Sequence, residues 1–160
     1  MEILLITIIA INAVVSFKGF NDQLFFRKYE FHIGSIKAGE QLRMLTSGFL
    51  HVDIAHLAFN MITFYFFAPI VLHQFGNLGF LTIYFGSLVS GSLLTYFFHK
   101  DEYHYRAVGA SGAVTGIIYS SILLHPDMQL LLFFCHSHSR LYFWNWIFNV
   151  FYLWNESKIR

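Results

Sequence analysis

Four stretches of mostly apolar residues, each near the length that crosses a bilayer, constrain this chain more than any other feature. They cover residues 1–17, 54–72, 78–98 and 107–124. A transmembrane helix needs roughly 20 mostly apolar residues, so each stretch is a predicted membrane span. Charged residues make up only 12% of the sequence, too few to cover a water-facing surface. We therefore expect an all-α, polytopic transmembrane helix bundle with about four complete spans.

The first stretch and the overall charge narrow the possibilities further. Residues 1–17 lack the basic start and the small-residue cleavage site of a signal peptide, so we expect a retained first span. The net charge of +1 favours no nucleic-acid partner. The single cysteine, Cys135, excludes an internal disulfide.

Residues 18–43 form the most polar part of the chain and hold half of its ten Lys and Arg residues. Their interspersed apolar side chains predict a loop that lies in the membrane interface. The positive-inside rule would place this loop in the cytoplasm.

The segment HVDIAHLAFN, residues 51–60, carries four polar side chains at a predicted membrane helix: His51, Asp53, His56 and Asn60. Such groups are costly in lipid and indicate function by default. His56 and Asn60 are four residues apart, so they share a helix face. His51 and His56 are five apart, about 140° round a helix, and are not expected to converge on one point. That spacing also argues against the H-E-x-x-H site of zinc proteases. The alternative is that these groups only bond to neighbouring spans or cap the helix.

The octapeptide GASGAVTG, residues 109–116, places Ser111 near the predicted start of the fourth span. Backbone N–H groups at a helix start have no intrahelical partner and can bind an anion, so a serine here could attack a carbonyl while its own N–H holds the oxyanion. The other interpretation is a packing seam, because Gly112 and Gly116 form a G-x-x-x-G face.

Together these stretches resemble the rhomboid family of intramembrane serine proteases. GEQLRMLTSGFLH, residues 39–51, is similar to the family's run from the first loop into the second span, with Arg43 at its usual arginine. HVDIAHLAFN matches the family's H-x-x-x-x-H-x-x-x-N pattern, and GASGAVTG matches its G-x-S-G motif. The resemblance covers roughly residues 1–134.

The resemblance implies a serine endopeptidase that cleaves transmembrane segments of membrane proteins, without a metal or other cofactor. It implies Ser111 as the nucleophile, with His56, Asn60 and the Ser111 N–H as the oxyanion hole. The residues implied in supporting roles are Gly109, Gly112, His51 and Arg43. Transmembrane substrates and the lipid bilayer are the expected partners. The loop 18–43 would lie on the non-cytoplasmic side, against the charge rule, and a bacterial chain would lie in the plasma (inner) membrane.

In the family, the proton of the serine goes to a histidine on the sixth span, and nothing in this chain matches that pattern. The histidines after Ser111 are His125, His136 and His138. His125 falls at the far end of the serine's own predicted helix, about 21 Å away. We therefore expect the 160 residues as written to lack a general base and meaningful proteolytic activity.

Residues 135–160 form an aromatic tail that has no glycine and holds all three tryptophans of the chain. One interpretation is a divergent fifth span or interfacial helix, because aromatic residues are favoured at the membrane interface. The other is a frameshift that truncates the protein. The codons of Phe133, Phe134 and Cys135 can contain an uninterrupted run of thymines that ends at the first base of the Cys codon, and one shifted frame turns every Trp codon into Gly. The predicted organisation is a partial rhomboid-like domain over 1–134 and an aberrant tail over 135–160.

Two other classes of function remain open at this stage. One is a non-catalytic membrane protein that binds client transmembrane helices, in which Ser111→Ala would change nothing. The other is a small transporter or assembly subunit, in which serine and histidine only join helices and Ser111 does not react with a serine-directed probe.

Overall fold

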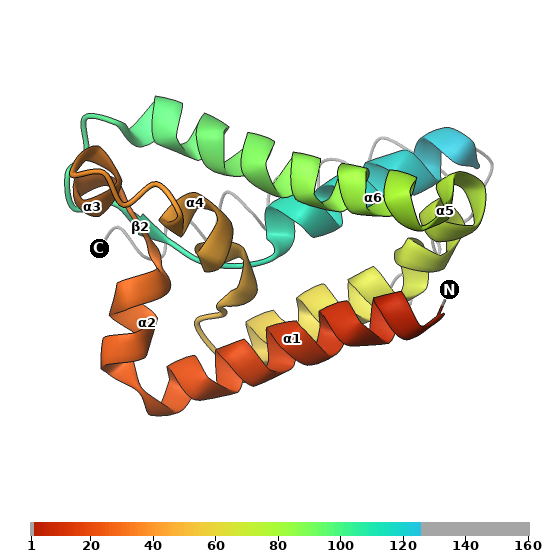
Figure 1. The fold of residues 1–160 in the computed structure, drawn as a ribbon, viewed down its shortest axis with the longest axis horizontal. Helices are drawn as coiled ribbons and strands as arrows, with labels where there is room; N and C mark the ends of the chain where they lie inside the picture. Colours follow the sequence, from red (N-terminus) through yellow and green to blue (C-terminus); the bar gives the residue numbers. More distant parts are fainter. Residues whose placement is uncertain (1, 126–160) are drawn as a thin grey trace, which may run out of the picture. The chain divides into compact units, whose positions relative to one another are not determined.

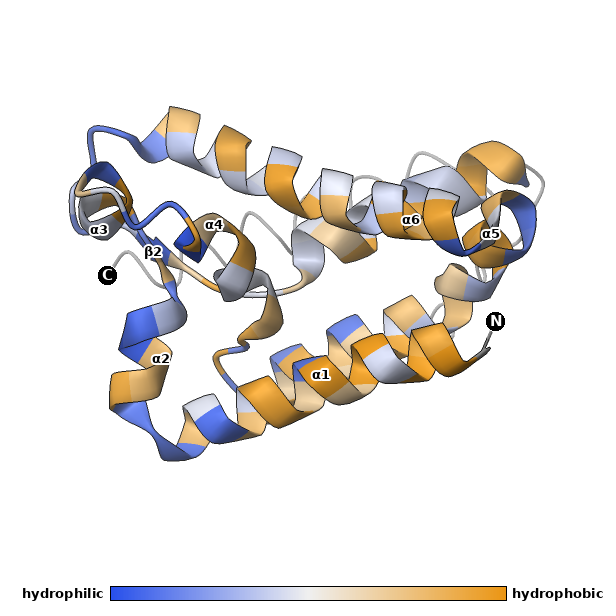
Figure 2. Ribbon diagram, viewed as in Figure 1, coloured by the Kyte–Doolittle hydropathy of each residue, from blue (hydrophilic) through white to orange (hydrophobic). Residues whose placement is uncertain are grey.

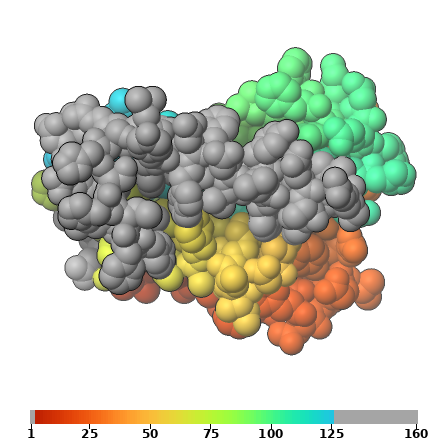
Figure 3. Space-filling model, turned by 180° about the vertical axis from the view of Figure 1, so that it is seen from behind, coloured from red at the N-terminus to blue at the C-terminus, as the bar shows by residue number. Residues whose placement is uncertain are grey.

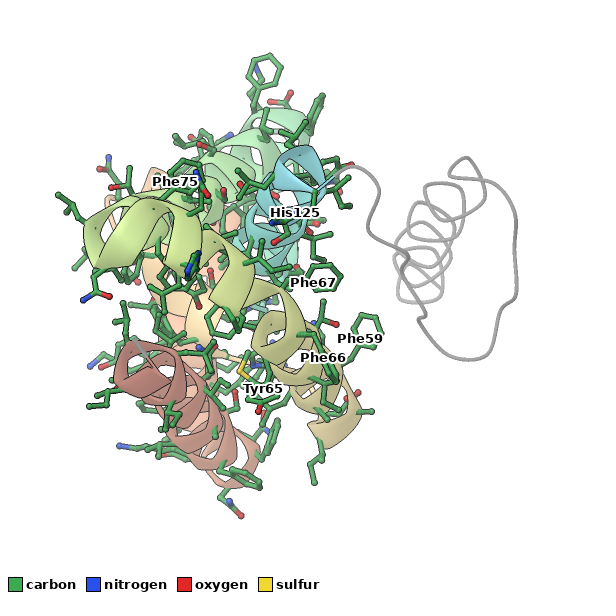
Figure 4. All side chains as sticks on the ribbon, turned by 90° about the vertical axis from the view of Figure 1, so that its right-hand side faces the viewer. Phe59, Tyr65, Phe66, Phe67, Phe75 and His125 are labelled. Carbon is green, nitrogen blue, oxygen red and sulfur yellow. The ribbon has the colours of Figure 1, made fainter. Side chains whose placement is uncertain are left out.

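A computed structural model describes residues 2–125, and three helices carry the fold: α1 (Glu2–Asn21), α5 (Ile54–His99) and α6 (Ser111–Leu124) (Figure 1). The segments Ile3–Asn21 and Ile54–His99 are long and apolar enough to cross a membrane, while α6 is a shorter apolar helix. Large apolar side chains point outward as well as inward, as they do in lipid. Phe59 and Phe66, for example, project away from the first half of α5 (Figure 4).

The long helix α5 consists of two halves that fold back on one another at Gly76 (Figure 1). Gly76 has φ +64°, in the left-handed region that glycine adopts without steric cost, and it is the non-helical residue inside α5. The reversal therefore takes a single residue, between the predicted spans 54–72 and 78–98.

Aromatic side chains join the two halves of α5. Phe64 from the first half packs against Phe80 and Tyr84 from the second, with ring centroids 5.9 and 5.5 Å apart, and all three side chains are fully buried. The buried amide of Asn12 on α1 reaches the same cluster, with Nδ2 3.5 Å from the Tyr84 hydroxyl. A polar contact thus ties α1 to α5 inside the apolar core.

Helix α6 packs against both halves of α5. A Cβ atom at Gly91 would lie 3.6 Å from the Gly112 Cα, so the two backbones approach closely there, as small residues allow in membrane helices. Farther along α6, the buried Ser121 hydroxyl donates to the Phe67 carbonyl at 3.1 Å. The G-x-x-x-G face of the octapeptide is therefore a packing face in its α6 portion.

The polar loop between α1 and α5 is largely folded and contains α2 (Gln23–Tyr29), α3 (Ile33–Lys37), α4 (Arg43–Thr46) and a 3-10 turn, η1 (Ser47–Phe49). Strand β1 (Phe31–His32) pairs antiparallel with β2 (Arg106–Ala107), so this loop is joined to the segment before α6. Phe31, Ile33 and Ile36 form a small core beneath it. Figure 2 shows the contrast between this hydrophilic part and the apolar α1.

The observed boundaries differ from the predicted ones where polar residues intervene. Helix α1 continues to Asn21, beyond the predicted end at residue 17. The segment expected to begin a span at residue 107 first forms β2, and α6 begins only at Ser111. Residues 106–107 are strand because they pair with the polar loop, a long-range contact that local apolarity does not reveal.

Candidate active site

Ser111 is the first residue of α6, and the residue before it, Ala110, gives the helix no side-chain cap. The Val114 N–H is the first to bond back, to the Ala110 carbonyl at 2.9 Å. The N–H groups of the first turn have no intrahelical acceptor and lie at the positive end of the helix dipole. Ser111 therefore combines a hydroxyl with a backbone site suited to an oxyanion.

Gly109 brings the serine and His56 to the same small volume. A Cβ atom built at Gly109 would lie 2.7 Å from His56 Cε1, 3.0 Å from His56 Nε2 and 3.8 Å from Ser111 Oγ. The imidazole and the hydroxyl thus both border the space that a side chain at Gly109 would occupy. Gly109 also has φ +132°, which side chains other than hydrogen rarely permit. Glycine is required here for two reasons: the positive φ of its backbone, and the lack of room for a Cβ atom beside His56.

Asn60 lies one helical turn beyond His56 on α5 and is buried. Its Nδ2 donates to the His56 carbonyl at 3.0 Å. An amide nitrogen carries two hydrogens, so this bond leaves a second donor for a ligand. Asp53 begins the helix, since its carboxylate accepts from the His56 N–H at 2.7 Å. The start of α5 reaches the surface on the face shown in Figure 3.

His51 lies nearer to His56 than the helical spacing predicted. The two ring centroids are 4.9 Å apart in an edge-to-face arrangement. The prediction that they would not converge was wrong, because it extended the helical period through residues 51–53, whereas α5 begins at Ile54 after its Asp53 cap. The preceding chain is non-helical and returns the His51 ring toward the site.

His51 is fully buried and hydrogen-bonded on both ring nitrogens. Nδ1 lies 2.8 Å from Ser16 Oγ on α1, and Nε2 accepts the Ala110 N–H at 3.5 Å. Burial, assisted by the neighbouring His56, lowers the pKa of His51 to about 3. His51 is therefore a neutral ring at physiological pH. Next to this bond, the Gly109 N–H donates to the Ser47 carbonyl at 3.0 Å.

Arg43 and Gly112 make structural contacts near the site. Arg43 donates to the carbonyls of Arg27 and Glu30, at 2.7 and 3.1 Å, and so braces the polar loop. A Cβ at Gly112 would lie 3.6 Å from the Ser87 carbonyl oxygen, which places Gly112 in the interface between α6 and α5. Both residues therefore support the fold around the site.

Within residues 2–125, no group hydrogen-bonds to Ser111 Oγ, and no three His, Cys, Asp or Glu side chains gather closely enough to hold a metal ion. His125 lies exposed at the other end of α6 (Figure 4). His136, His138 and the tail 135–160 fall outside the described residues. The arrangement brings a serine hydroxyl, an imidazole and the N–H groups of a helix start to one place.

Comparisons with known proteins identify the family of the chain. The Rhomboid domain family matches residues 38–159. This chain belongs to the rhomboid family. It is 30% identical to the mitochondrial RHOMBOID-like protein 12 of Arabidopsis thaliana, over 75% of this chain and 40% of that protein. It is 37% identical to the rhomboid protease GluP of Bacillus subtilis, over 52% of this chain and 16% of that one. It is 28% identical to the mitochondrial rhomboid protein 1 of Saccharomyces cerevisiae, over 58% of this chain and 28% of that one.

The rhomboid spans at most two fifths of the length of these relatives. Its membership confirms the predicted helical membrane bundle and identifies it as an integral membrane protein. The matched range includes residues 135–159.

Sequence reasoning missed two residues that the rhomboid places around its serine. Ser16 and the Ser47 carbonyl hold His51 and Gly109 respectively. Ser16 lies in the first helix, outside the matched range, in a stretch that was predicted only as a membrane span. No sequence spacing links it to GASGAVTG.

Proposed function

We propose that this rhomboid is a serine-type intramembrane endopeptidase in which Ser111 is the nucleophile. The observation that carries the proposal is the place of Gly109, whose missing Cβ leaves room between the His56 ring and Ser111 Oγ. A substrate carbonyl entering this space would meet the hydroxyl on one side and an imidazole on the other. No metal ion or organic cofactor has a role in this mechanism.

The oxyanion would be held by three donors. The Ser111 N–H at the start of α6 is one, and His56 and Asn60 supply the side-chain donors. When Ser111 Oγ bonds to the carbonyl carbon, the carbonyl oxygen becomes negative, and these donors stabilise it most at that point. Removing one such donor typically costs a factor of about 10² to 10³ in kcat.

The serine proton needs a base that residues 2–125 do not place on Ser111 Oγ. We propose that the 160 residues alone have no meaningful proteolytic activity, because no residue matches the sixth-span histidine of the family and His125, just after the end of α6, is about 21 Å along the helix from the serine. The proposed division into a rhomboid-like part over 1–134 and an out-of-frame tail over 135–160 would account for this. A run of thymines at codons 133–135 in the gene supports the frameshift, and its absence rejects it.

The substrates we propose are transmembrane segments of other membrane proteins. The site is formed by helices that cross or enter the membrane, so a substrate would reach it from the lipid. In a bacterium the enzyme would lie in the plasma membrane, although two of the relatives compared are named as mitochondrial.

The test is cleavage of a fluorescent transmembrane segment in liposomes, together with labelling by a fluorophosphonate. Two proteins are compared: the 160-residue chain and a version continued in the frame that encodes a downstream histidine-bearing span. The continued protein is expected to cleave and to be labelled, and Ser111→Ala abolishes both. His56→Ala lowers cleavage by about 10²-fold or more. The matched control is Ser120→Ala on the same helix, which leaves cleavage unchanged.

Each outcome has one meaning. Cleavage that survives Ser111→Ala rejects the nucleophile. Ser111-dependent cleavage by the 160-residue chain rejects the proposed inactivity. Binding of a transmembrane segment without cleavage by the continued protein, unaffected by Ser111→Ala, supports the non-catalytic helix-binding function instead.

A further inference from the structure

We infer that Ser16, on the first helix, is a positioning residue for Ser111 and acts through the ring of His51. The inference rests on the proposed function only in that Ser111 is the residue positioned. The hydrogen bonds on which it depends hold whether or not the serine is a nucleophile.

The first step is the identity of the protonated ring nitrogen in His51. A backbone N–H can only donate, so the Ala110 N–H requires His51 Nε2 to be the acceptor. A neutral imidazole carries one hydrogen, which must then be on Nδ1. That hydrogen points at Ser16 Oγ, 2.8 Å away. The opposite tautomer would set two donors against each other at Ala110.

The second step is the hydroxyl of Ser16. Because it accepts from His51 Nδ1, its own hydrogen is free to donate, and the Phe49 carbonyl lies 3.1 Å from Ser16 Oγ. The chain of donors therefore runs in one direction, from Ala110 through His51 and Ser16 to Phe49. Every member is matched with an acceptor, which is how a buried polar network contributes to a unique structure.

The third step concerns the residues that this series of hydrogen bonds holds in place. Ala110 is fully buried and lies between Gly109, which faces His56, and Ser111. A shift of the Ala110 N–H would move the carbonyl and amide groups that set the direction of the first turn of α6. Both Ser16 and His51 are fully buried, so water does not replace a lost bond there. The first helix thereby helps to fix the orientation of the serine.

The experiment is nitrogen NMR of the 160-residue chain in detergent micelles. We expect His51 to show a protonated Nδ1 and an unprotonated Nε2. Ser16→Ala removes the acceptor of Nδ1–H, so the two nitrogen signals move toward each other and the Ala110 and Ser111 amide signals shift. Ser16→Thr keeps a hydroxyl and restores the wild-type signals.

Thr7→Ala is the matched control on the same helix. The exposed Thr7 hydroxyl donates to the Ile3 carbonyl of its own helix, so its loss leaves the signals of His51, Ala110 and Ser111 unchanged. Should Ser16→Ala fail to fold, Ser16→Cys replaces the hydroxyl with a weaker partner and gives the same shifts in smaller amount. A protonated Nε2 in the wild type, or unchanged Ala110 and Ser111 amides in a folded Ser16 variant, overturns the inference.

A second measurement separates this inference from the proposed function. In the continued protein, Ser16→Ala should slow fluorophosphonate labelling of Ser111 by about 10- to 100-fold, and Ser16→Thr should restore it. If wild-type Ser111 is not labelled at all, the proposed function fails, and the nitrogen signals still decide the role of Ser16. If labelling is normal in folded Ser16→Ala, the positioning role is rejected while the nucleophile stands.

Discussion

The segment that leads into α6 is held at two places, by charged groups at Arg106 and by neutral ones at Gly109 and Ala110. Glu30, whose side chain is 3% exposed, pairs with Arg106, whose side chain is 40% exposed. Only three residues later the Gly109 N–H bonds to a carbonyl, and the Ala110 N–H bonds to the neutral His51. The first anchor can use charge because water still reaches the arginine.

The second anchor avoids charge for a physical reason. His51 is fully enclosed, and an ionised imidazole there would lose its hydration, a cost that the nearby Asp53 carboxylate offsets only in part. It would also add a positive charge next to the His56 ring, 4.9 Å away. The segment is therefore held by an ion pair where water reaches one of the charged groups, and by neutral hydrogen bonds where the groups are enclosed.

The strongest disruption of the neutral anchor should be Gly109→Ala. The substitution adds a Cβ 2.7 Å from His56 Cε1 at a residue with φ +132°, so backbone strain and overpacking combine. We expect a loss of about 4 kcal/mol in the free energy of unfolding. Chemical denaturation in detergent measures it.

Gly39→Ala is the control for that prediction. Gly39 also has a positive φ, +105°, but nothing lies within 4 Å of its added Cβ. This variant should lose only the strain contribution, about 1 to 2 kcal/mol. Equal losses in the two variants would show that the contact with His56 does not contribute to the loss in the free energy of unfolding.

Acidification should also weaken the neutral anchor. The pKa of His51 is about 3 in the folded protein, below the ordinary 6.5, so the unfolded chain binds more protons between these values. Stability contributed by this group is therefore complete above pH 6.5 and decreases as the pH falls toward 3, by about 1.4 kcal/mol for each pH unit. Denaturation at a series of pH values measures the slope.

His51→Gln identifies the source of that slope. His32 also has a lowered pKa, chiefly through burial and then the nearby Arg106, and contributes in the same direction. The slope should therefore become shallower in His51→Gln without vanishing. An unchanged slope would mean that His51 is not the group that resists protonation.

At the charged anchor, Glu30→Gln should cost about 2 kcal/mol, less than the change at Gly109. The substitution keeps the side-chain size and removes the charge that Arg106 and Arg27 face. Breaking a buried pair is costly, but the partial exposure of Arg106 lets water recover part of the loss. Thermal unfolding of the purified variant measures the effect, and a neutral result would mean that backbone hydrogen bonds, not the ion pair, hold this segment.

The smallest effect should come from Glu40→Gln. Glu40 pairs with Arg43, yet its side chain is 57% exposed. Exposed pairs of this kind contribute about 0.2 to 1 kcal/mol. The same thermal measurement checks it, and a loss as large as that of Glu30→Gln would remove the distinction between enclosed and exposed carboxylates in this loop.

Much of the bundle could be predicted from the sequence, because length and apolarity mark membrane spans by themselves. The approach of His56 to Ser111 was expected from matching motifs, and the space at Gly109 agrees with it. The place of His51 was mispredicted, although Asp53, a residue type that often caps helices, indicated a helix start at Ile54. The two-residue β1–β2 pairing is too short to leave a pattern.

Ser16 shows why part of the site could not be predicted. Hydroxyl residues in apolar helices commonly donate to a carbonyl of their own helix, as Thr82 and Thr95 do here. Ser16 instead reaches His51, and that choice depends on the packing of α1 beside the residues before α5. No local sequence rule distinguishes the two cases.

Helix α1 lies outside the range 38–159 that defines the family in this chain, yet it supplies the hydroxyl under His51. An expression fragment trimmed to the family range would keep every motif residue and still lose that support. Fragment boundaries for this protein are therefore better chosen from hydrogen bonds than from alignments.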